Sequence, residues 1–376
     1  MAKLRVGVIF GGRSGEHEVS LLSARSVMAA MDPAKYEVVP IGITKDGRWI
    51  AGGDPMKALA EGDLSLSGPA TLLPDPSRTG LMRLEETDGR MVLSLLSELD
   101  VVFPVLHGPY GEDGTVQGLL DLAGIPYVGA GVTGSALGMD KAVFKDLMRA
   151  HGLPVVEYLL VKRRDWETDP EEVMDRVEAR LGYPVFTKPA NLGSSVGVNK
   201  CRHRGELARG LADAARYDRK VLVEAAVPRA REIEVSVLGN DEPEASVVGE
   251  IIPSREFYSY TAKYLDDGER ASKLLIPAPL PAETAERVRD LAIRAYLAID
   301  CAGMARVDFL LSAETGALYL SEVNTIPGFT AISMYPKLWE ASGLPYPELI
   351  DRLIQLALER HADRARNQIE YRPEGA

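Results

Sequence analysis

Four side chains in the last third of the sequence have the types and spacing of a metal-assisted phosphate site. Arg306 and Asp308 lie two residues apart in one β-type run, and Glu322 and Asn324 lie two apart in the next. Residues two apart in a strand share a face, so a hairpin would gather all four. Mg²⁺ prefers carboxylate and amide oxygens that it shares with phosphates, which favours a nucleotide triphosphate beside the guanidinium. The alternative is a solvated hairpin with surface charges.

The sequence of residues 304–330 predicts the hairpin that this chemistry needs. Two apolar runs, 305–311 and 317–323, flank the turn-like segment 312–316, which is the usual signature of paired antiparallel strands. A tail rich in glycine and proline, 325–328, follows the second run.

A second segment, residues 188–198, has the composition of a phosphate-covering loop. Lys188 ends a strand-like run, and Gly193, Ser194 and Ser195 follow it among other small residues. Backbone N–H groups and hydroxyls in such a loop can surround phosphate oxygens. The segment is not a P-loop, because GxxxxGK[ST] occurs nowhere in the sequence. A flexible turn that joins two strands is the alternative.

Two further candidates follow predicted strands near the amino terminus. The apolar run 4–10, a glycine-rich turn and a helix over 16–31 predict the start of a β-α-β unit. Ligands of such sheets bind at the carboxyl ends of the strands, so Glu16 would face one, although a carboxylate there also complements the helix dipole. His107 follows the strand 101–106 and opens a glycine-rich segment; a ligand contact and a satisfied structural histidine are equally compatible with it.

Two other patterns carry weaker signals. Lys141 lies near the start of a predicted helix, 135–150, where a lysine is usually only solvated. Residues 129–134 fit the dinucleotide pattern GxGxxG, but they lie far from the amino-terminal β-α-β unit, in whose first turn that fingerprint belongs. We therefore interpret this match as a decoy.

The remaining pattern changes character near residues 130–150, which indicates that a second domain starts there. Residues 255–273 hold four aromatic residues without a clear period, and we interpret them as a long lid loop that includes Lys263 and Tyr264. Residues 51–99 are turn-rich and carry no predicted chemistry. The other predicted elements are strands over 36–43, 155–161, 183–188, 221–224 and 231–239, the last half-exposed, and helices over 170–181, 282–298 and 346–365.

Composition bounds the class of protein. A chain of 376 residues with 46% hydrophobic and 26% charged residues is expected to form two or three globular domains. The net charge of −12 argues against nucleic-acid binding. Cys201 and Cys301 have neither disulfide nor zinc spacing. No apolar run is long enough for a membrane span. The amino terminus has no signal-peptide layout. These features favour the cytoplasm and no membrane.

Taken in order, the motifs resemble those of the ATP-grasp ligases, and most closely the D-alanine:D-alanine ligase family. The resemblance covers almost the whole chain and is specific because the motifs occur together. They are GGRSGEHEVS from residue 11, HGPYGEDGTVQG from 107, GMDK from 138, KPANLGSSVG from 188, EFYSYTAKY from 256, MARVDF from 304 and SEVNTIPGFT from 321.

The resemblance implies a role for each matching position. The residues implied in ATP binding are Lys141, Lys188, Ser194, Ser195, Glu224, Glu232 and Lys263. The implied ligands of two Mg²⁺ or Mn²⁺ ions are Asp308, Glu322 and Asn324. The residues implied in substrate binding are Glu16, His107, Arg306, Gly328 and Ser333. The implied catalytic set is Glu16, Ser194, Tyr264, Arg306 and Lys263, in which Glu16, Ser194 and Tyr264 form a hydrogen-bonded group that closes the lid.

The family resemblance also implies the reaction. One D-alanine carboxylate attacks the γ-phosphate of ATP, and the amine of a second D-alanine attacks the resulting acylphosphate, which yields a peptidoglycan precursor. Tyr264 favours this dipeptide over the D-alanyl-D-lactate ester, in whose producers the matching residue is commonly not tyrosine. The fold implied is an amino-terminal Rossmann-like parallel-sheet domain, 1–130, followed by two ATP-grasp subdomains, 131–225 and 226–376. A cytoplasmic homodimer is implied as well.

Two alternatives remain open at this point. One is another ATP-dependent ligase of carboxylates, such as a D-lactate-using type. The other is a nucleotide-binding sensor or scaffold without turnover, which we would expect to lack one of Lys188, Arg306, Asp308 or Glu322, and all four are present.

Overall fold

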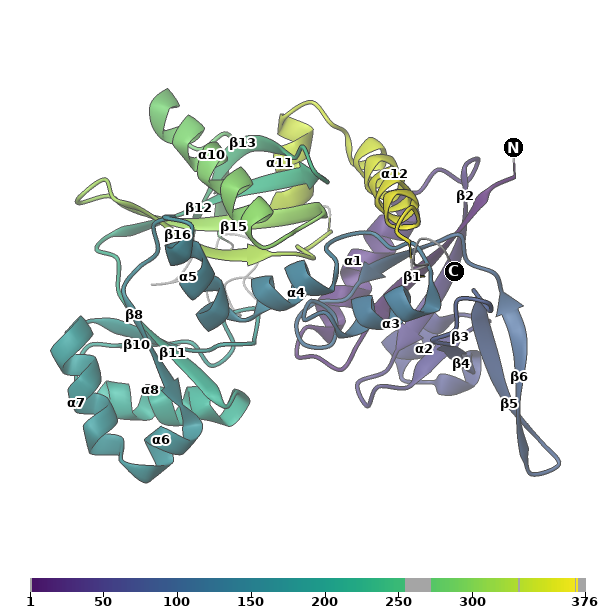
Figure 1. Cartoon of the computed structure of the whole chain (residues 1–376), viewed down its shortest axis with the longest axis horizontal. Coiled ribbons are helices and arrows are strands. Elements are labelled where there is room, and N and C mark those ends of the chain that lie inside the picture. The colour runs from purple at the N-terminus through teal and green to yellow at the C-terminus, as the bar shows by residue number, and fades with distance from the viewer. Residues whose placement is uncertain (1, 254–271, 331, 369, 371–376) are drawn as a thin grey trace, which may run out of the picture.

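The described part of the chain forms three β-sheets with helices packed around them, which confirms the predicted α/β class (Figure 1). The structure is a computed structural model and describes residues 2–253, 272–330, 332–368 and 370. The predicted lid residues Lys263 and Tyr264 lie outside the described residues. No helix in the described part of the chain combines the length and apolar character that a membrane crossing needs.

The amino-terminal sheet has seven strands in the order β6-β5-β4-β3-β2-β1-β7. Its predicted parallel part consists of β1 between β2 and β7, and β1 is an almost continuous apolar run because both faces of the sheet are covered. Residues 49–97 extend the sheet with antiparallel strands. The elements are β1 Leu4–Gly11, α1 His17–Ala30, β2 Tyr36–Ile43, β3 Trp49–Ala51, α2 Pro55–Glu61, the 3₁₀ turn η1 Leu64–Leu66, β4 Gly68–Leu72, β5 Leu81–Thr87, β6 Arg90–Ser97, β7 Val101–Val105 and α3 Thr115–Ala123.

The second sheet is antiparallel and has four strands in the order β10-β9-β11-β8. Helices α6, α7 and α8 gather around it in Figure 1. Its core is formed by the apolar sides of these strands and of α7 and α8. The elements from this part of the chain are α4 Val132–Met139, α5 Lys141–Ala150, β8 Tyr158–Lys162, α6 Arg163–Thr168, α7 Pro170–Leu181, β9 Val185–Pro189, β10 Asn199–Cys201, α8 Arg204–Tyr217 and β11 Lys220–Ala225.

The prediction of one helix over 135–150 was wrong, because the structure has two helices there. Asp140 has an extended backbone with ψ 94° and separates α4 from α5. Its carboxylate accepts hydrogen bonds from the backbone N–H groups of Ala142 and Val143, each at 3.2 Å. An aspartate in this position stabilises a new helix start. Lys141 is therefore the first residue of α5 rather than an internal helix residue.

The third sheet has five strands in the order β14-β13-β12-β15-β16 and is antiparallel throughout. The prediction that residues 231–239 are half-exposed was wrong, since 233–239 are buried between helices. Ile233, Val235 and Val237 pack in the core that α10 covers, while Ser236 on the opposite face donates to the carbonyl of Tyr335 in α11. The elements are β12 Ala230–Gly239, β13 Glu244–Ile252, β14 Lys273–Leu275, α10 Ala282–Ala298, β15 Gly303–Ser312, β16 Leu318–Asn324, α11 Met334–Ala341 and α12 Tyr346–Arg364.

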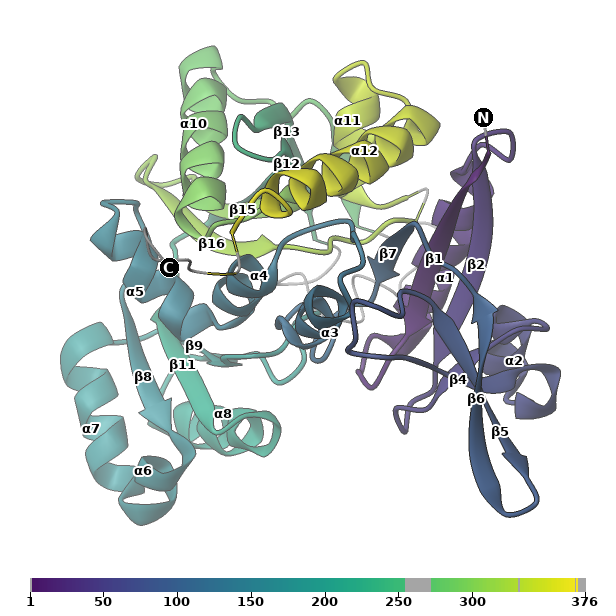
Figure 2. The ribbon, with the colours of Figure 1, turned by 45° about the vertical axis from the view of Figure 1, so that its right-hand side comes forward.

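Helix α12 and the chain before it pack across to the amino-terminal sheet. Figure 2 shows α12 in front of the third sheet and reaching towards α1 and β1. The ring of Phe329 lies edge-on to Phe103 of β7 with centroids 5.9 Å apart, and it contacts Tyr335 at 5.3 Å. One hydrophobic cluster thereby includes both the first sheet and α12. The predicted domain bounds at 130 and 225 remain predictions.

The GxGxxG segment packs against backbone, which supports its interpretation as a decoy. A Cβ on Gly134 would lie 2.8 Å from the carbonyl oxygen of Asp300, and one on Gly303 would lie 3.0 Å from the nitrogen of Gly129. The first contact is closer than real Cβ atoms come to backbone and the second is tighter than nearly all of them, so these glycines permit close packing of two chain segments.

Arg360 of α12 fastens that helix to the segment after β7. Its guanidinium donates to the carbonyl oxygens of Gly129 and Tyr127, the latter at 3.1 Å, and lies 4.6 Å above the Tyr127 ring.

We expect Arg360→Ala to lower the free energy of unfolding by about 1–3 kcal/mol, because two carbonyl partners and a ring contact are lost. Urea unfolding followed by circular dichroism measures this. The exposed Arg366→Ala is the control and should change stability by less than about 0.5 kcal/mol; equal effects of both would contradict the role of Arg360.

Candidate active site

The hairpin of β15 and β16 brings the four predicted side chains to one face. Arg306 is paired with Asn324, and Asp308 with Glu322, so the predicted hairpin and its shared face are confirmed. The amide nitrogen of Asn324 donates to Asp308 at 3.0 Å. Two guanidinium nitrogens of Arg306 donate to the two oxygens of Asp308, each at 2.7 Å. The result is a concentrated set of hard oxygen atoms with a cation beside it.

Glu234 of β12 is a member of this cluster that the sequence analysis missed. Its Oε2 lies 3.0 Å from Nε of Arg306, and its side chain is 5% exposed. Arg306 therefore lies between two carboxylates, and although burial lowers the pKa of Arg306, Asp308 and Glu234 raise it well above its ordinary value. The sequence could have indicated Glu234, because side chains alternate in direction along a strand. Glu234 is two residues from Glu232 and therefore shares its face of β12.

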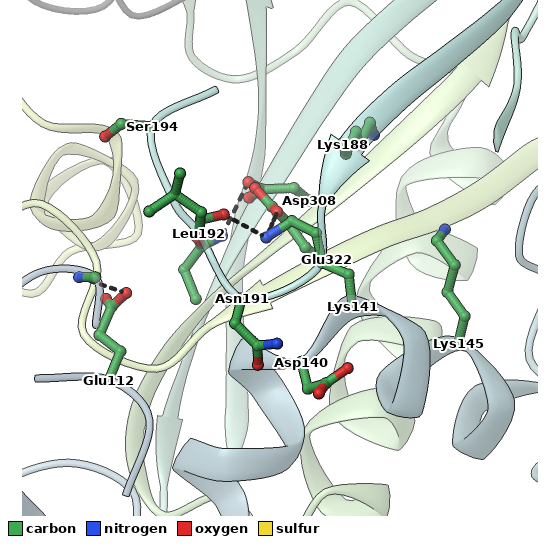
Figure 3. A network of polar contacts seen from close by, with 12 residues as sticks. Glu112, Asp140, Lys141, Lys145, Lys188, Asn191, Leu192, Ser194, Asp308 and Glu322 are labelled. Atoms are coloured by element: carbon green, nitrogen blue, oxygen red, sulfur yellow. Dashed lines mark hydrogen bonds and ion pairs between the residues drawn. The ribbon is translucent and has the colours of Figure 1, made fainter. Parts of the chain in front are cut away.

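Lys141 joins the glycine-serine loop to the hairpin. Its Nζ donates to the carbonyl oxygen of Leu192 at 3.0 Å and lies 3.2 Å from Oε2 of Glu322 (Figure 3). The base of the loop is fixed as well, because the backbone N–H of Lys141 donates to the carbonyl of Ala190 at 3.0 Å. The solvated interpretation of Lys141 is wrong, since its side chain is only 14% exposed and points into the cluster. The loop and the acidic hairpin thus face each other across a short distance.

The loop itself has a backbone that few residues adopt. Ser194 and Ser195 have φ of 49° and 57°, in the left-handed region that costs non-glycine residues about 1–2 kcal/mol each. Such conformations persist where the surroundings enforce them and are common at ligand-binding loops. The hydroxyl of Ser194 is buried and donates to Glu16.

Glu16 lies where three segments of the chain meet. A Cβ on Gly193 would be 2.6 Å from its Oε2, and one on Gly108 would be 2.9 Å away. Glu16 precedes α1, but its side chain makes no capping hydrogen bond, and the carboxylate is 8% exposed. The helix-dipole alternative does not account for this burial or for the bond from Ser194. The predicted link between Glu16 and Ser194 is present, while Tyr264, its third member, lies outside the described residues.

His107 is held by two hydrogen bonds in a buried position. Nδ1 lies 3.0 Å from the carbonyl oxygen of Ile326 and must donate to it, so Nε2 accepts from the hydroxyl of Ser23 at 3.1 Å. Burial lowers the pKa of His107 despite the nearby Glu16, which favours the neutral ring that these two hydrogen bonds need. The same Ser23 hydroxyl accepts from the backbone N–H of Phe329 at 3.3 Å. His107 therefore holds the segment after the hairpin, as expected of a structural histidine with both ring nitrogens hydrogen-bonded. Its contact with a substrate remains a prediction.

Gly328 and Ser333 lie together at the start of α11. A Cβ on Gly328 would be 3.0 Å from Oγ of Ser333, and that hydroxyl accepts from the backbone N–H of Thr330 at 3.0 Å. Ser333 is the residue before the first turn of α11. The N-terminal end of a helix carries partial positive charge, which suits a carboxylate.

A buried group of two lysines and one glutamate lies behind the loop. Oε2 of Glu224 is 2.6 Å from Nζ of Lys188, and Oε1 is 2.9 Å from Nζ of Lys145. Burial alone would raise the pKa of Glu224, but the two lysines outweigh it and lower the pKa to about 2. Burial lowers the pKa of Lys188, yet it is raised overall by Glu224, Glu322 and Glu232. The sequence analysis placed Lys188, Glu224 and Glu232 in one site but missed Lys145.

This combination defines a class of protein. Two antiparallel sheets hold a lysine-bearing glycine-serine loop opposite a carboxylate hairpin, which is the arrangement of an ATP-grasp fold. Sequence models of the D-ala D-ala ligase N-terminus and C-terminus match residues 5–130 and 147–355. The chain therefore belongs to the D-alanine–D-alanine ligase family.

Individual relatives agree with this assignment. The chain is 50% identical over 372 residues to a D-alanine–D-alanine ligase of Natranaerobius thermophilus, which covers 99% of each chain. Among solved structures, the D-alanine-D-alanine ligase from Coxiella burnetii has a TM-score of 0.81 with 37% identity and covers 97% of both chains. A D-Ala:D-Ser ligase from Enterococcus faecalis also has a TM-score of 0.81, with 36% identity over 95% of this chain and 100% of that one.

The low pKa of Glu224 predicts a pH dependence of stability. The unfolded chain binds a proton at Glu224 below its ordinary pKa of 4.5, whereas the folded protein does so only near 2. The stabilisation is therefore complete above pH 4.5 and is lost as the pH falls towards 2. We expect the wild type to lose about 1–2 kcal/mol more than Glu224→Gln between pH 5 and 3 in urea unfolding experiments. Glu314→Gln, at an exposed turn, should follow the wild type, and parallel pH curves for all three would refute the coupling.

Proposed function

We propose that this protein uses ATP to join two molecules of D-alanine into D-alanyl-D-alanine, a precursor of peptidoglycan. The observation that carries the proposal is the meeting of three segments at Glu16, Lys141 and the hairpin. Ser194 links the loop to Glu16, and Lys141 links it to Glu322. Family membership supports the identity of the substrates, and the contacts among the loop, Glu16 and the hairpin support a site for a triphosphate and two amino acids.

In the first step, a carboxylate oxygen of the first D-alanine attacks the γ-phosphorus of ATP, and ADP leaves. Lys141 and Lys188 would contact the phosphates, with the hydroxyls of Ser194 and Ser195 and the Lys263 ammonium covering them. Glu224 and Glu232 would hold the adenosine. Glu16 would bind the ammonium group of the first D-alanine, because it is a buried carboxylate that accepts a hydrogen bond from a neutral serine hydroxyl and can take a cation as partner.

In the second step, the uncharged amine of the second D-alanine attacks the acylphosphate carbonyl, and inorganic phosphate leaves. The Ser333 hydroxyl and the Gly328 backbone, at the start of α11, would receive that molecule's carboxylate. Negative charge gathers on the carbonyl oxygen during this attack. Arg306 would stabilise it, and a preorganised donor of this kind is typically worth about 3–4 kcal/mol.

The hairpin fits divalent cations that would come with the nucleotide. Asp308 and Glu322 supply carboxylates, and the Asn324 amide supplies a carbonyl oxygen, the donors that Mg²⁺ and Mn²⁺ prefer. Within the described residues no three His, Cys, Asp or Glu side chains form a metal site, so ATP phosphates would complete the coordination of the two proposed ions. When bound, such ions neutralise charge on the phosphates during transfer.

Three finer statements belong to the same proposal. We infer a cytoplasmic enzyme from its part in making a cell-wall precursor. We also infer a homodimer, for which family membership is the only support. We infer a preference for D-alanine over D-lactate at the second position from the identity of Tyr264, which lies outside the described residues.

The central test is release of phosphate from Mg-ATP with D-alanine, with L-alanine as control. We expect D-alanine-dependent release and D-alanyl-D-alanine as the product by mass spectrometry. Glu322→Ala and Arg306→Ala should each lower kcat by at least about 100-fold, because a proposed metal ligand and a charge-stabilising donor are lost. Glu314→Ala, in the exposed turn of the same hairpin, should retain activity. Full activity in Glu322→Ala or Arg306→Ala would contradict the role assigned to that residue. Identifying the product when D-lactate or D-serine competes with D-alanine would test the choice of second substrate.

Gly193→Ala tests the contact between the loop and Glu16. The added methyl group would lie 2.6 Å from Oε2 of Glu16, so the carboxylate or the loop must move. We expect kcat/KM for D-alanine to fall about 10- to 100-fold, because small displacements in a catalytic site are costly. Gly118→Ala is the control, since its methyl group would meet only Val132, at 4.0 Å. Wild-type kinetics in Gly193→Ala would show that this close approach is unimportant.

A further inference from the structure

Lys145 is a buried charged residue to which the proposed reaction gives no role. It lies on α5, four residues after Lys141, and is 0% exposed. Lysine is almost never fully buried unless it is paired, because burial of an unpaired ammonium group is very costly. Its position in the core between α5 and β11 therefore needs an explanation.

The partner of Lys145 is one oxygen of Glu224. Nζ of Lys145 lies 2.9 Å from Oε1, while Oε2 of the same carboxylate is 2.6 Å from Nζ of Lys188. One lysine would already neutralise this carboxylate. With the second lysine, two ammonium groups share one carboxylate.

The two lysines differ in their access to the cleft. The side chain of Lys188 is 18% exposed, whereas that of Lys145 is 1% exposed. Burial lowers the pKa of Lys145, while Glu224 opposes this shift. Of these two lysines, Lys188 is the one that a phosphate group could reach. If Lys188 turns towards the phosphates, Glu224 keeps a cation only because Lys145 remains beside it.

We propose that Lys145 is a positioning residue for nucleotide binding, which holds the Glu224 carboxylate in place so that Lys188 is free to bind phosphate. This inference rests on the proposed function for the role of the nucleotide. Lys145 itself does not touch the nucleotide. Without it, Lys188 is the one cation paired with Glu224 among the described residues, and a buried carboxylate that loses its partner is strongly destabilised.

The experiment measures Mg-ATP binding by calorimetry without D-alanine and steady-state kinetics with it. We expect Lys145→Met to raise the Kd of Mg-ATP and the KM for ATP about 10-fold or more, since a charge-assisted contact is removed. The kcat and the KM for D-alanine should change less than about twofold. Lys162→Met, at an exposed lysine on neighbouring β8, is the matched control and should bind Mg-ATP like the wild type. Lys145→Gln, which keeps a hydrogen-bond donor, provides a second variant if Lys145→Met does not fold.

A double variant separates positioning from direct contact. In the Glu224→Gln background, Lys145→Met should cause no further weakening of Mg-ATP binding, because the two residues act as one unit. An equal loss in both backgrounds, or unchanged Mg-ATP binding in a folded single variant, would overturn the proposal. Parallel losses in kcat, in both KM values and in stability would also overturn it by showing a merely structural role.

The same data distinguish this inference from the function on which it rests. A wild type that binds Mg-ATP but releases no phosphate with D-alanine would refute the ligase, while the binding series would still decide the role of Lys145. A wild type that binds no Mg-ATP would overturn both.

Discussion

Every part of this site depends on the pairing of buried charges. A carboxylate or ammonium group that leaves water is tolerated only with an opposite charge and hydrogen bonds close by. Glu224 lies between two lysines, and Arg306 lies between Glu234 and Asp308. Glu224 and Arg306 each have two partners of opposite charge. One partner can therefore turn to a ligand while the second stays beside Glu224 or Arg306. This arrangement holds a concentrated set of charges that can receive a polyanion.

The architecture around the site follows from this constraint. The paired charges come from the second and third sheets and Glu16 comes from the turn after the first strand, so the described site residues are drawn from all three sheets or the turns beside them. Helix α12 and the ring of Phe329 hold the third sheet against the first, and backbone contacts at α5 hold the second. Close approach at Gly108 and Gly193 brings the loops near enough for one serine hydroxyl to bridge them.

Much of the fold and many site residues could be predicted from the chain alone. The parallel core, the hairpin and the helices over 170–181 and 282–298 follow from local apolar periodicity, which is a property of neighbouring residues. The break at Asp140 was not predicted, because a capping aspartate competes with an otherwise continuous helical pattern. Lys145 and Glu234 were missed because a charged residue on a helix or an alternating strand normally faces solvent.

By itself, the sequence determined the family, the chemical types gathered at the hairpin and loop, and the order of the elements that present them. These depend on residue identity and short-range spacing. Only the tertiary structure decided which charges are buried and with whom: Lys141 with Glu322, Lys145 with Glu224, and Glu16 beside two glycines. The physical reason is that burial and pairing depend on segments far apart in the chain, and no local pattern specifies how such segments pack.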